Sequence, residues 1–358
     1  MRRIIFWQPF ASPHQEAFLE AVAEQFSGEV ILGVERPNLP PDRVAQGWRA
    51  PKHVRVRVID ISKPENHAAL SAYRSPESLH VYTGFFSHPL VWAGFHELVA
   101  SQAKLAIYSE APEQPPLTGW IKRLRGRLLA WRWSRRFAFV LAVGGVGCEF
   151  FRRIGFPPAA IIPFGYFLAP STLIARPEPS TDDAYRFVSA GQFVSRKGID
   201  MLIDACAWLP RTGWRVDIYG DGPARNSLLA RAARKGLSSA INFYETIKNE
   251  SLSERLATAD CTVLPSRFDG WGAIVSESLG IGTPAICTAT CGVASVVADN
   301  PSFRSHTCEP TVSGIHRAMQ AALHAGRVPA AFRRDIQAQA EHVLSPSLAA
   351  RRFLALAE

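Results

Sequence analysis

The second half of the chain alternates short β-rich runs with helical segments, and this alternation constrains the fold more than any other feature. Residues 186–191 (RFVSAG) are predicted as a buried strand, and residues 198–209 (GIDMLIDACAWL) carry apolar side chains at helical spacing. The same order recurs up to residue 289, with further predicted strands RVDIYG, INFYE, CTVLPS and PAICTA. Strands separated by helices of about 10–15 residues indicate βαβ units and a parallel sheet.

The first half follows a looser version of this pattern, and a polar stretch separates the two halves. Residues 169–185 (APSTLIARPEPSTDDAY) are rich in Pro, Ser and Asp and are predicted as an interdomain linker. We therefore expect an N-terminal Rossmann-like domain over 1–168, a C-terminal one over 186–340, and a helix over 341–358 that packs back toward the first domain. The predicted fold class is α/β, with two doubly wound domains facing a cleft, because such sheets bind ligands at their carboxyl edge.

Composition favours a protein of the cytoplasm. Hydrophobic residues make up 47% of the chain, which is enough for two cores. The six cysteines form no CxxC pair, which argues against a zinc site and a disulfide framework. The start of the chain has too few apolar residues before Pro9 for a signal peptide. The longest apolar run, residues 137–148 (FAFVLAVGGVGC), is too short to span a membrane and is predicted as a buried strand with a Gly-rich turn.

Most of the positive charge is concentrated in one segment. Residues 114–148 contain seven Lys and Arg side chains and no acid, which leaves only +2 of the net charge of +9 (9 − 7) for the rest of the chain. Within this segment, four apolar residues recur at helical spacing: Ile121, Leu124, Leu128 and Trp131. A basic amphipathic helix with Trp favours an anionic membrane surface, although a solvated helix that packs through its apolar stripe fits as well. No nucleic-acid-binding motif accompanies the charge, so we expect no nucleic-acid partner.

Two carboxylates lie close together in residues 266–284 (SRFDGWGAIVSESLGIGTP). Asp269 belongs to a Gly-rich loop after a predicted strand, and Glu277 lies in the helix that follows. The helix begins near Gly272, where unpaired N–H groups and the positive end of the helix dipole favour phosphate. Both carboxylates are able to accept hydrogen bonds from vicinal hydroxyls of a ribose or a pyranose. The alternative is a turn-forming Asp and a solvated helix charge.

A neighbouring loop supplies positive charge at the same predicted edge of the sheet. The stretch SAGQFVSRKGID follows the first strand of the C-terminal domain, and it places Arg196 and Lys197 at the carboxyl end of that strand. These side chains are suited to neutralising a diphosphate. The two loops together predict an anion site that faces a pair of carboxylates.

The C-terminal half resembles the retaining GT-B glycosyltransferases of glycosyltransferase family 4. The similarity runs from about Phe187 to Val297 and rests on GQFVSRKGID, on GDGP at Gly220–Pro223, and on PSRFDGWGAIVSESLGIGTP. It implies a GT-B fold and the use of a nucleotide-sugar donor such as a UDP- or GDP-sugar. It also implies that no metal or other cofactor is needed.

The resemblance assigns roles to the donor-side residues. It implies that Lys197, in the motif that begins at Gly191, holds the diphosphate, and that Glu277 holds the ribose. Asp269 would contact the donor sugar, and the backbone at Gly272 and Ala273 would cradle it. Two departures from the family pattern stand out: its usual Glu is Asp269, and its usual Arg is Gln192, for which Arg196 is a candidate substitute.

The N-terminal half matches the family only in architecture. The family often has a histidine after one of its later strands, and here Glu110 occupies that place, in LAIYSEAPEQ. His88, in TGFFSHP, is the competing candidate for this catalytic role. Ser12 and His14, in the turn after the first strand, are the acceptor-side candidates. A solvated strand-end side chain is the alternative for each.

These observations predict an enzyme. We expect it to move a sugar from a nucleotide-diphosphate donor to a hydroxyl acceptor with retention, in surface polysaccharide or glycolipid biosynthesis. Its location would be the cytoplasm, peripheral on the inner face of the membrane. Two alternatives stay open: a sugar-nucleotide epimerase of the same fold, and a catalytically dead glycosyltransferase-like subunit.

Overall fold

A computed structural model describes residues 1–45, 47–83, 88–113, 119–167, 184–247 and 249–358. The chain divides into two compact units. Unit 1 consists of Met1–Val44, Arg49–Ala169 and Ser345–Glu358, and unit 2 consists of Ala45–Trp48 and Pro170–Leu344. The predicted linker, residues 169–185, lies outside the described residues except for its last two.

Unit 1 is built on a seven-stranded parallel sheet with the order β3-β2-β1-β4-β5-β6-β7. The interior strand β1 buries Ile4, Ile5, Phe6 and Trp7 completely. Such continuous apolar runs are typical of parallel strands covered on both faces. The strands are β1 (Arg3–Phe10), β2 (Glu29–Arg36), β3 (Arg57–Asp60), β4 (Ser78–Tyr82), β5 (Lys104–Ser109), β6 (Phe139–Val143) and β7 (Ile161–Phe164).

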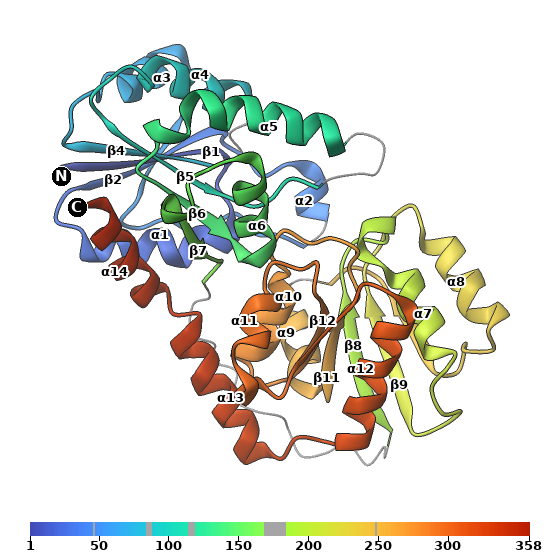
Figure 1. Ribbon diagram of the computed structural model, residues 1–358. Coiled ribbons are helices and arrows are strands. Elements are labelled where there is room, and N and C mark those ends of the chain that lie inside the picture. Colours follow the sequence, from blue (N-terminus) through green and yellow to red (C-terminus); the bar gives the residue numbers. More distant parts are fainter. Residues whose placement is uncertain (46, 84–87, 114–118, 168–183, 248) are drawn as a thin grey trace. The chain divides into compact units, whose positions relative to one another are not determined.

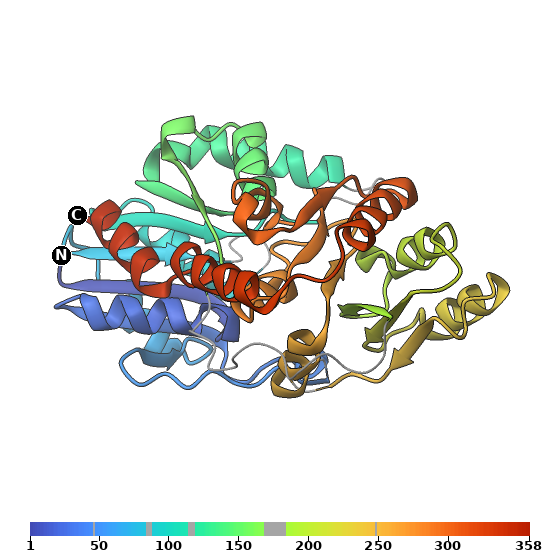
Figure 2. The same cartoon turned by 90° about the horizontal axis from the view of Figure 1, so that it is seen from below.

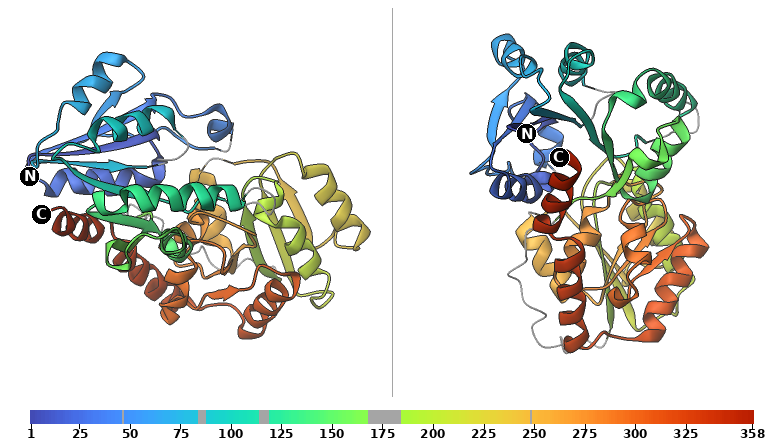
Figure 3. Two further views of the ribbon diagram at one scale, coloured as in Figure 1. Left: turned by 45° about the horizontal axis from the view of Figure 1, so that its top comes forward. Right: turned by 60° about the vertical axis from the view of Figure 1, so that its left-hand side comes forward.

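Helices cover both faces of this sheet. Helices α3, α4 and α5 lie on one face, and α1 and α14 lie side by side on the other (Figures 1, 2 and 3). The described α-helices of unit 1 and its boundary are α1 (Pro13–Gln25), α2 (Pro41–Ala45), α3 (Pro64–Ser71), α4 (Pro89–Leu98), α5 (Gly119–Trp133), α6 (Gly144–Ile154) and α14 (Pro346–Ala357).

The C-terminal helix α14 is part of the core of unit 1. Its Phe353 is fully buried, with its ring centroid 5.6 Å from those of both Phe6 and Phe18. The Lys104 ammonium donates to the last carbonyls of the helix, at 2.8 Å from the oxygen of Ala357. The helix expected over 341–358 is interrupted, because α13 (Ala330–Val343) ends before α14 begins at Pro346.

The Gly-rich stretch after β6 is a helix and not the predicted turn. Strand β6 ends at Val143, and α6 begins immediately at Gly144, whose φ is 68°. The glycines 144 and 147 are buried, and the helix ends at Gly155 in the left-handed conformation. The buried strand within residues 137–148 is confirmed, whereas the turn was wrong because small residues at a tight strand-to-helix junction resemble turn residues.

Unit 2 contains a six-stranded parallel sheet with the order β10-β9-β8-β11-β12-β13. Its strands are β8 (Tyr185–Ala190), β9 (Trp214–Tyr219), β10 (Ile241–Tyr244), β11 (Cys261–Leu264), β12 (Ala285–Thr288) and β13 (His306–Cys308). Its helices are α7 (Ile199–Cys206), α8 (Arg225–Arg234), α9 (Asn249–Thr258), α10 (Ala273–Gly280), α11 (Ala294–Ala298), α12 (Val312–Ala325) and α13 (Ala330–Val343). The expected alternation of strands and helices is confirmed.

One hydrophobic cluster of unit 2 lies on a single face of its sheet. Helices α7, α8 and α12 pack on that face around fully buried side chains such as Phe187, Val216 and Ile218 (Figure 1). Helices α9 and α10 lie on the opposite face. The loops at the carboxyl ends of β8 and β11 emerge at one edge, because the two strands are parallel neighbours.

Candidate functional site

The loop after β8 is held against the loop after β9 by close backbone contact. A Cβ atom at Gly220 would lie 2.0 Å from the carbonyl oxygen of Gly191, so only glycine fits there. The amide of Phe193 donates to the carbonyl of Asp221 at 2.8 Å, and the amide of Gly191 donates to that of Tyr219 at 3.0 Å. The GDGP motif therefore fixes the course of the loop that carries Arg196 and Lys197.

The structure brings Lys197 and Asp269 together. The Lys197 ammonium donates to Asp269 Oδ2 at 2.6 Å, and an Arg196 guanidinium nitrogen lies 3.9 Å from the same oxygen. The Lys197 side chain extends over Gly191, where an added Cβ would meet it at 3.5 Å. Two basic residues of one strand-end loop thus converge on the acidic residue of the next.

Asp269 is ionised although it is only 9% exposed. Burial alone would raise the pKa of its carboxyl, but the charge and hydrogen bond of Lys197, together with Arg196, hold this pKa below its ordinary value. Its Oδ1 atom also accepts from the amide of Trp271 at 3.3 Å. A fixed carboxylate beside a fixed ammonium is the result.

A salt bridge that the sequence did not reveal braces these two loops. The Arg267 guanidinium donates to both carboxylate oxygens of Asp200, at 2.7 and 2.6 Å, and to the carbonyl of Ser195 at 2.7 Å. The Arg267 amide donates to the carbonyl of Arg196 at 2.8 Å. Arg267 therefore positions the loop of Lys197 against the loop of Asp269.

Helix α10 begins directly after the Asp269 loop. Gly272 precedes it with φ 97°, a left-handed conformation that favours glycine, and Ala273 is the first helical residue. The Trp271 indole is 3% exposed and donates to Ser276 Oγ at 2.9 Å, which fixes the entry to the helix. The first amides of α10 therefore lie beside the Lys197–Asp269 pair, at the end of a helix that favours anions.

Glu277 lies on the second turn of α10 and is half-buried. Burial raises the pKa of its carboxyl to about 7. Within the part of the chain that the structure describes, no side chain or amide donates to this carboxylate, and no cation pairs with it. A buried carboxyl without a partner, in the helix that follows a Lys–Asp pair, is suited to a ligand hydroxyl.

In unit 1, the side chains of His14, Glu110 and Tyr166 lie together beyond the carboxyl ends of the strands. The first two were predicted as site residues. The Tyr166 hydroxyl donates to Glu110 Oε1 at 2.6 Å, and the Tyr166 ring stacks on the His14 imidazole with centroids 5.8 Å apart. Ser12 caps the N-terminus of α1, two residues before His14, without a side-chain cap hydrogen bond. Tyr166 was missed; its place just after a strand was the available signal.

Among the described residues, no hydrogen bond or ring contact joins His88 to that cluster, although β4, the strand before it, lies between β1 and β5 in the sheet. His88 is the N-cap residue of α4, after β4, whereas Glu110 follows β5. Burial lowers the pKa of His88, with Glu35 opposing and Arg36 reinforcing the shift. Glu110 is linked to His14 through Tyr166, which contacts both residues. The charged neighbours of His88 are instead Glu35 and Arg36 of β2.

The comparisons with known proteins agree with this geometry. Residues 171–341 match the family model described as glycosyl transferases group 1. That part of the chain belongs to this family. The resemblance drawn from the motifs around Lys197, Gly220, Asp269 and Glu277 is thereby confirmed.

Two curated relatives and one solved structure extend the comparison. The chain is 29% identical over 221 residues (54% of it) to the GDP-mannose-dependent alpha-(1-6)-phosphatidylinositol dimannoside mannosyltransferase of Mycobacterium tuberculosis. It is 27% identical over 132 residues (35% of it) to the alpha-D-kanosaminyltransferase of Streptomyces kanamyceticus. The matches span 57% and 34% of these proteins' own lengths.

The solved structure establishes the fold. The crystal structure of Anabaena HepE in complex with UDP superposes with a TM-score of 0.74 over 99% of both chains, at 12% sequence identity. The predicted α/β fold of the GT-B type is therefore confirmed. Among the described residues, no helix is both long and apolar enough to cross a membrane.

Proposed function

We propose that this protein is a retaining glycosyltransferase that moves a sugar from a nucleoside-diphosphate donor to a hydroxyl acceptor. One observation carries the proposal: the Lys197–Asp269 pair lies at the start of α10, the helix that holds the half-buried Glu277, which has no partner among the described residues. A cation, a helix N-terminus, a fixed carboxylate and a second carboxyl supply the complementary groups for a diphosphate, a sugar and a ribose.

Each donor-side residue then has a distinct role. Lys197 and the first amides of α10 neutralise the diphosphate. Arg196 adds positive charge in place of the family's usual arginine, whose position is occupied here by Gln192. The ammonium has three N–H donors, so Lys197 is able to hold a phosphate oxygen while it keeps its contact with Asp269. Glu277 accepts from the ribose hydroxyls, and Asp269 accepts from a hydroxyl of the donor sugar.

Transfer breaks the bond between the anomeric carbon and the diphosphate and forms a bond to the acceptor oxygen. The acceptor hydroxyl loses its proton in this step, and Glu110 is the group we assign to receive it, oriented by the Tyr166 hydroxyl. His14, stacked on Tyr166, and Ser12 are assigned to the acceptor side. No metal or further cofactor enters this scheme.

We further propose a glycolipid or surface-polysaccharide acceptor and a peripheral position on the cytoplasmic face of a membrane. The carrying feature is α5, whose predicted apolar stripe does not pack onto the protein. Its side chains are exposed by 38% at Ile121, 50% at Leu124, 59% at Leu128 and 83% at Trp131. These exposures favour a lipid surface over packing through the stripe, and the Lys and Arg residues around the stripe favour anionic lipid headgroups.

Donor turnover tests this function against its alternatives. UDP-, GDP- and ADP-sugars are incubated with the protein, with and without a lipid-linked glycan extract, and the nucleotide and sugar products are quantified. A transferase releases nucleoside diphosphate faster with the extract and labels a lipid-extractable product. Interconversion of donor sugars without acceptor identifies an epimerase instead, and binding of UDP with no turnover of any donor identifies an inactive subunit.

A further inference from the structure

The face of the unit 2 sheet that lies under α9 is polar, although both faces of a parallel sheet are normally apolar. Side chains two residues apart on a strand point to the same face. On this face, β8 presents Arg186 and the apolar Val188, β9 presents Arg215 and Asp217, and β10 presents Asn242. Their neighbours on the opposite face, such as Phe187 and Val216, belong to the core.

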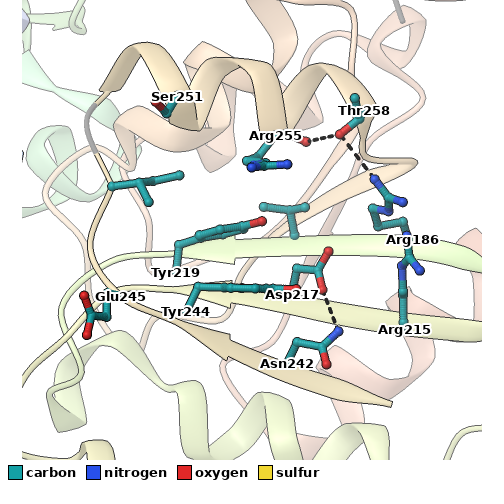
Figure 4. A pocket seen from close by; sticks show the side chains of 12 residues that line it. Arg186, Arg215, Asp217, Tyr219, Asn242, Tyr244, Glu245, Ser251, Arg255 and Thr258 are labelled. Atoms are coloured by element: carbon teal, nitrogen blue, oxygen red, sulfur yellow. Dashed lines mark hydrogen bonds between the residues drawn. The ribbon is translucent and has the colours of Figure 1, made fainter. Parts of the chain in front are cut away.

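A cavity of about 610 Å³ lies between this polar face and α9. This volume is within the range of small-molecule sites, about 300–1,000 Å³. Figure 4 shows that Arg186 and Arg215 lie at one end and that Tyr219, Tyr244 and Glu245 lie toward the other. Helix α9 covers the cavity with Ser251, Arg255 and Thr258.

The cavity is positively charged at one end and along its cover. Arg186 and Arg215 are register partners on adjacent strands, so their two guanidinium groups enter the same end. Arg186 donates to Thr258 Oγ1 at 3.4 Å, a long hydrogen bond that leaves most of its donors to other partners. Arg255 extends from α9 toward the strands in Figure 4. Three guanidinium groups around one space favour an anionic group.

The remainder of the cavity is suited to a hydroxylated ring. Asp217 is 7% exposed and accepts from Asn242 Nδ2 at 2.9 Å, which fixes both side chains as hydrogen-bonding groups on the floor. The rings of Tyr219 and Tyr244 stack on each other, with centroids 4.8 Å apart, and supply apolar surface beside them. A carboxylate, an amide and aromatic rings in one cavity provide both the polar and the apolar contacts that a pyranose requires.

From these observations we propose that the cavity under α9 is a binding site for an anionic monosaccharide, a sugar that carries a phosphate or a carboxylate. The arginines would bind the anionic group, and the floor and the tyrosines would bind the ring. The arginine end of this site lies away from the donor groups, because Arg186 and Arg215 lie near the amino ends of β8 and β9, whereas Lys197 and Asp269 lie beyond carboxyl ends. The tyrosine end of the site reaches the carboxyl ends of β9 and β10. It goes beyond the proposed transferase activity.

Isothermal titration of the full-length protein tests the site without any turnover. The probes are glucose 6-phosphate, glucuronate, glucose and inorganic phosphate. We expect glucose 6-phosphate or glucuronate to bind at one site and glucose to bind at least about tenfold more weakly, since it lacks the charged group. Binding of inorganic phosphate as tight as that of the sugar phosphate would reduce the site to an anion site and overturn the proposal, as would the absence of binding by both acidic sugars.

Three variants locate the binding. Arg255→Gln should weaken it about tenfold or more, because a charge-assisted hydrogen bond is lost. Ser251→Trp, at an exposed position on α9, should abolish sugar binding because the indole fills the cavity. This second variant tests the site even if the other two arginines replace Arg255. Arg234→Gln is the matched control: it changes an exposed arginine of α8, on the other face of the sheet. Unchanged affinity in both α9 variants would overturn the proposal.

Lys197→Ala and excess UDP separate this site from the donor site. Both should leave the affinity for the acidic sugar within about twofold of its original value, because none of Lys197, Asp269 and Glu277 lines the cavity under α9. If UDP displaces the sugar, or if Lys197→Ala abolishes its binding, the sugar occupies the donor site and the second site does not exist. These experiments measure binding and not sugar transfer. The binding result therefore stands even if the proposed transferase activity is not found.

Discussion

Lys197 and Asp269 form the ion pair at the centre of the proposed donor site. The exposed fractions of their side chains are 19% and 12%, so each charge is largely removed from water and is stabilised by the other. Breaking a buried pair by removing one partner costs about 3–5 kcal/mol, because the remaining charge is left uncompensated. We expect a cost at or below the lower end of this range, since both side chains keep some contact with solvent.

The first prediction is a coupling between these two residues. Lys197→Met and Asp269→Asn should each lower the melting temperature by several degrees, and the double variant should lose less than the sum of the two. Scanning fluorimetry of the four proteins in the same buffer measures this. Strictly additive losses would show that the 2.6 Å contact contributes nothing to stability.

Glu277 gives a second prediction, on pH. The pKa of its carboxyl is about 7 in the folded protein, above the ordinary value of 4.5, so the folded state holds a proton that the unfolded state releases. The stabilisation is therefore complete below pH 4.5 and is lost as the pH rises through 7. In melting curves between pH 5 and 8, Glu277→Gln should show a smaller loss of stability with pH than the parent. Equal slopes would refute the raised pKa.

A third prediction concerns the assigned proton acceptor. Glu110→Gln should lower the transfer rate by about 100- to 10,000-fold and leave UDP affinity nearly unchanged, because a general base acts on the acceptor and not on the nucleotide. Tyr166→Phe should have a smaller effect in the same direction, since it removes only the hydrogen bond that orients Glu110. A normal rate in Glu110→Gln would transfer the role to His88, and His88→Ala is the variant to measure next.

At the scale of elements, helix α5 carries the fourth prediction. The protein should sediment with anionic vesicles at low salt and be released as salt rises, because ionic screening shortens the range of the attraction. Leu128→Glu with Trp131→Glu should abolish sedimentation, since it places charge on the exposed stripe. Trp208→Glu is the control, an equally drastic change at a 57% exposed tryptophan of unit 2. Equal binding of neutral and anionic vesicles would contradict the proposal.

The elements also show what the sequence alone was able to predict. The strands and helices of unit 2 followed from apolar periodicity, because each βα unit is a local pattern. The α5 stripe was visible in the sequence, but its exposure was not, because a pattern of apolar residues does not reveal whether a partner covers them. The Gly-rich start of α6 was mistaken for a turn, since residue type alone does not distinguish a tight junction from a loop.

The same division applies to the site. The loops of Lys197 and Asp269 were expected at one sheet edge, because parallel topology brings the carboxyl ends of strands together. Their direct ion pair, the Arg267–Asp200 brace and the contact of Tyr166 with Glu110 were not predicted. Each of these joins residues at least 56 positions apart, and such pairings depend on side-chain directions in the folded chain.

At the scale of the whole molecule, the chain builds two parallel sheets and then returns to the first. Helix α14 completes the core of unit 1, although 344 residues precede that returning segment. The two units carry different parts of the proposed chemistry: the donor groups Lys197, Asp269 and Glu277 are in unit 2, and Glu110 is in unit 1. The proposed sugar transfer would therefore use side chains of both units.

The most direct test is the anomeric configuration of the sugar that the protein releases. NMR follows the first turnovers with α-linked UDP- and GDP-sugars, before the free sugar equilibrates in water. The account predicts that the α anomer forms first, and that Asp269→Asn slows its release at least about 100-fold while UDP still binds, because the lost carboxylate contacts the sugar and not the nucleotide. Initial formation of the β anomer, or release by Asp269→Asn at the parent rate, would contradict it.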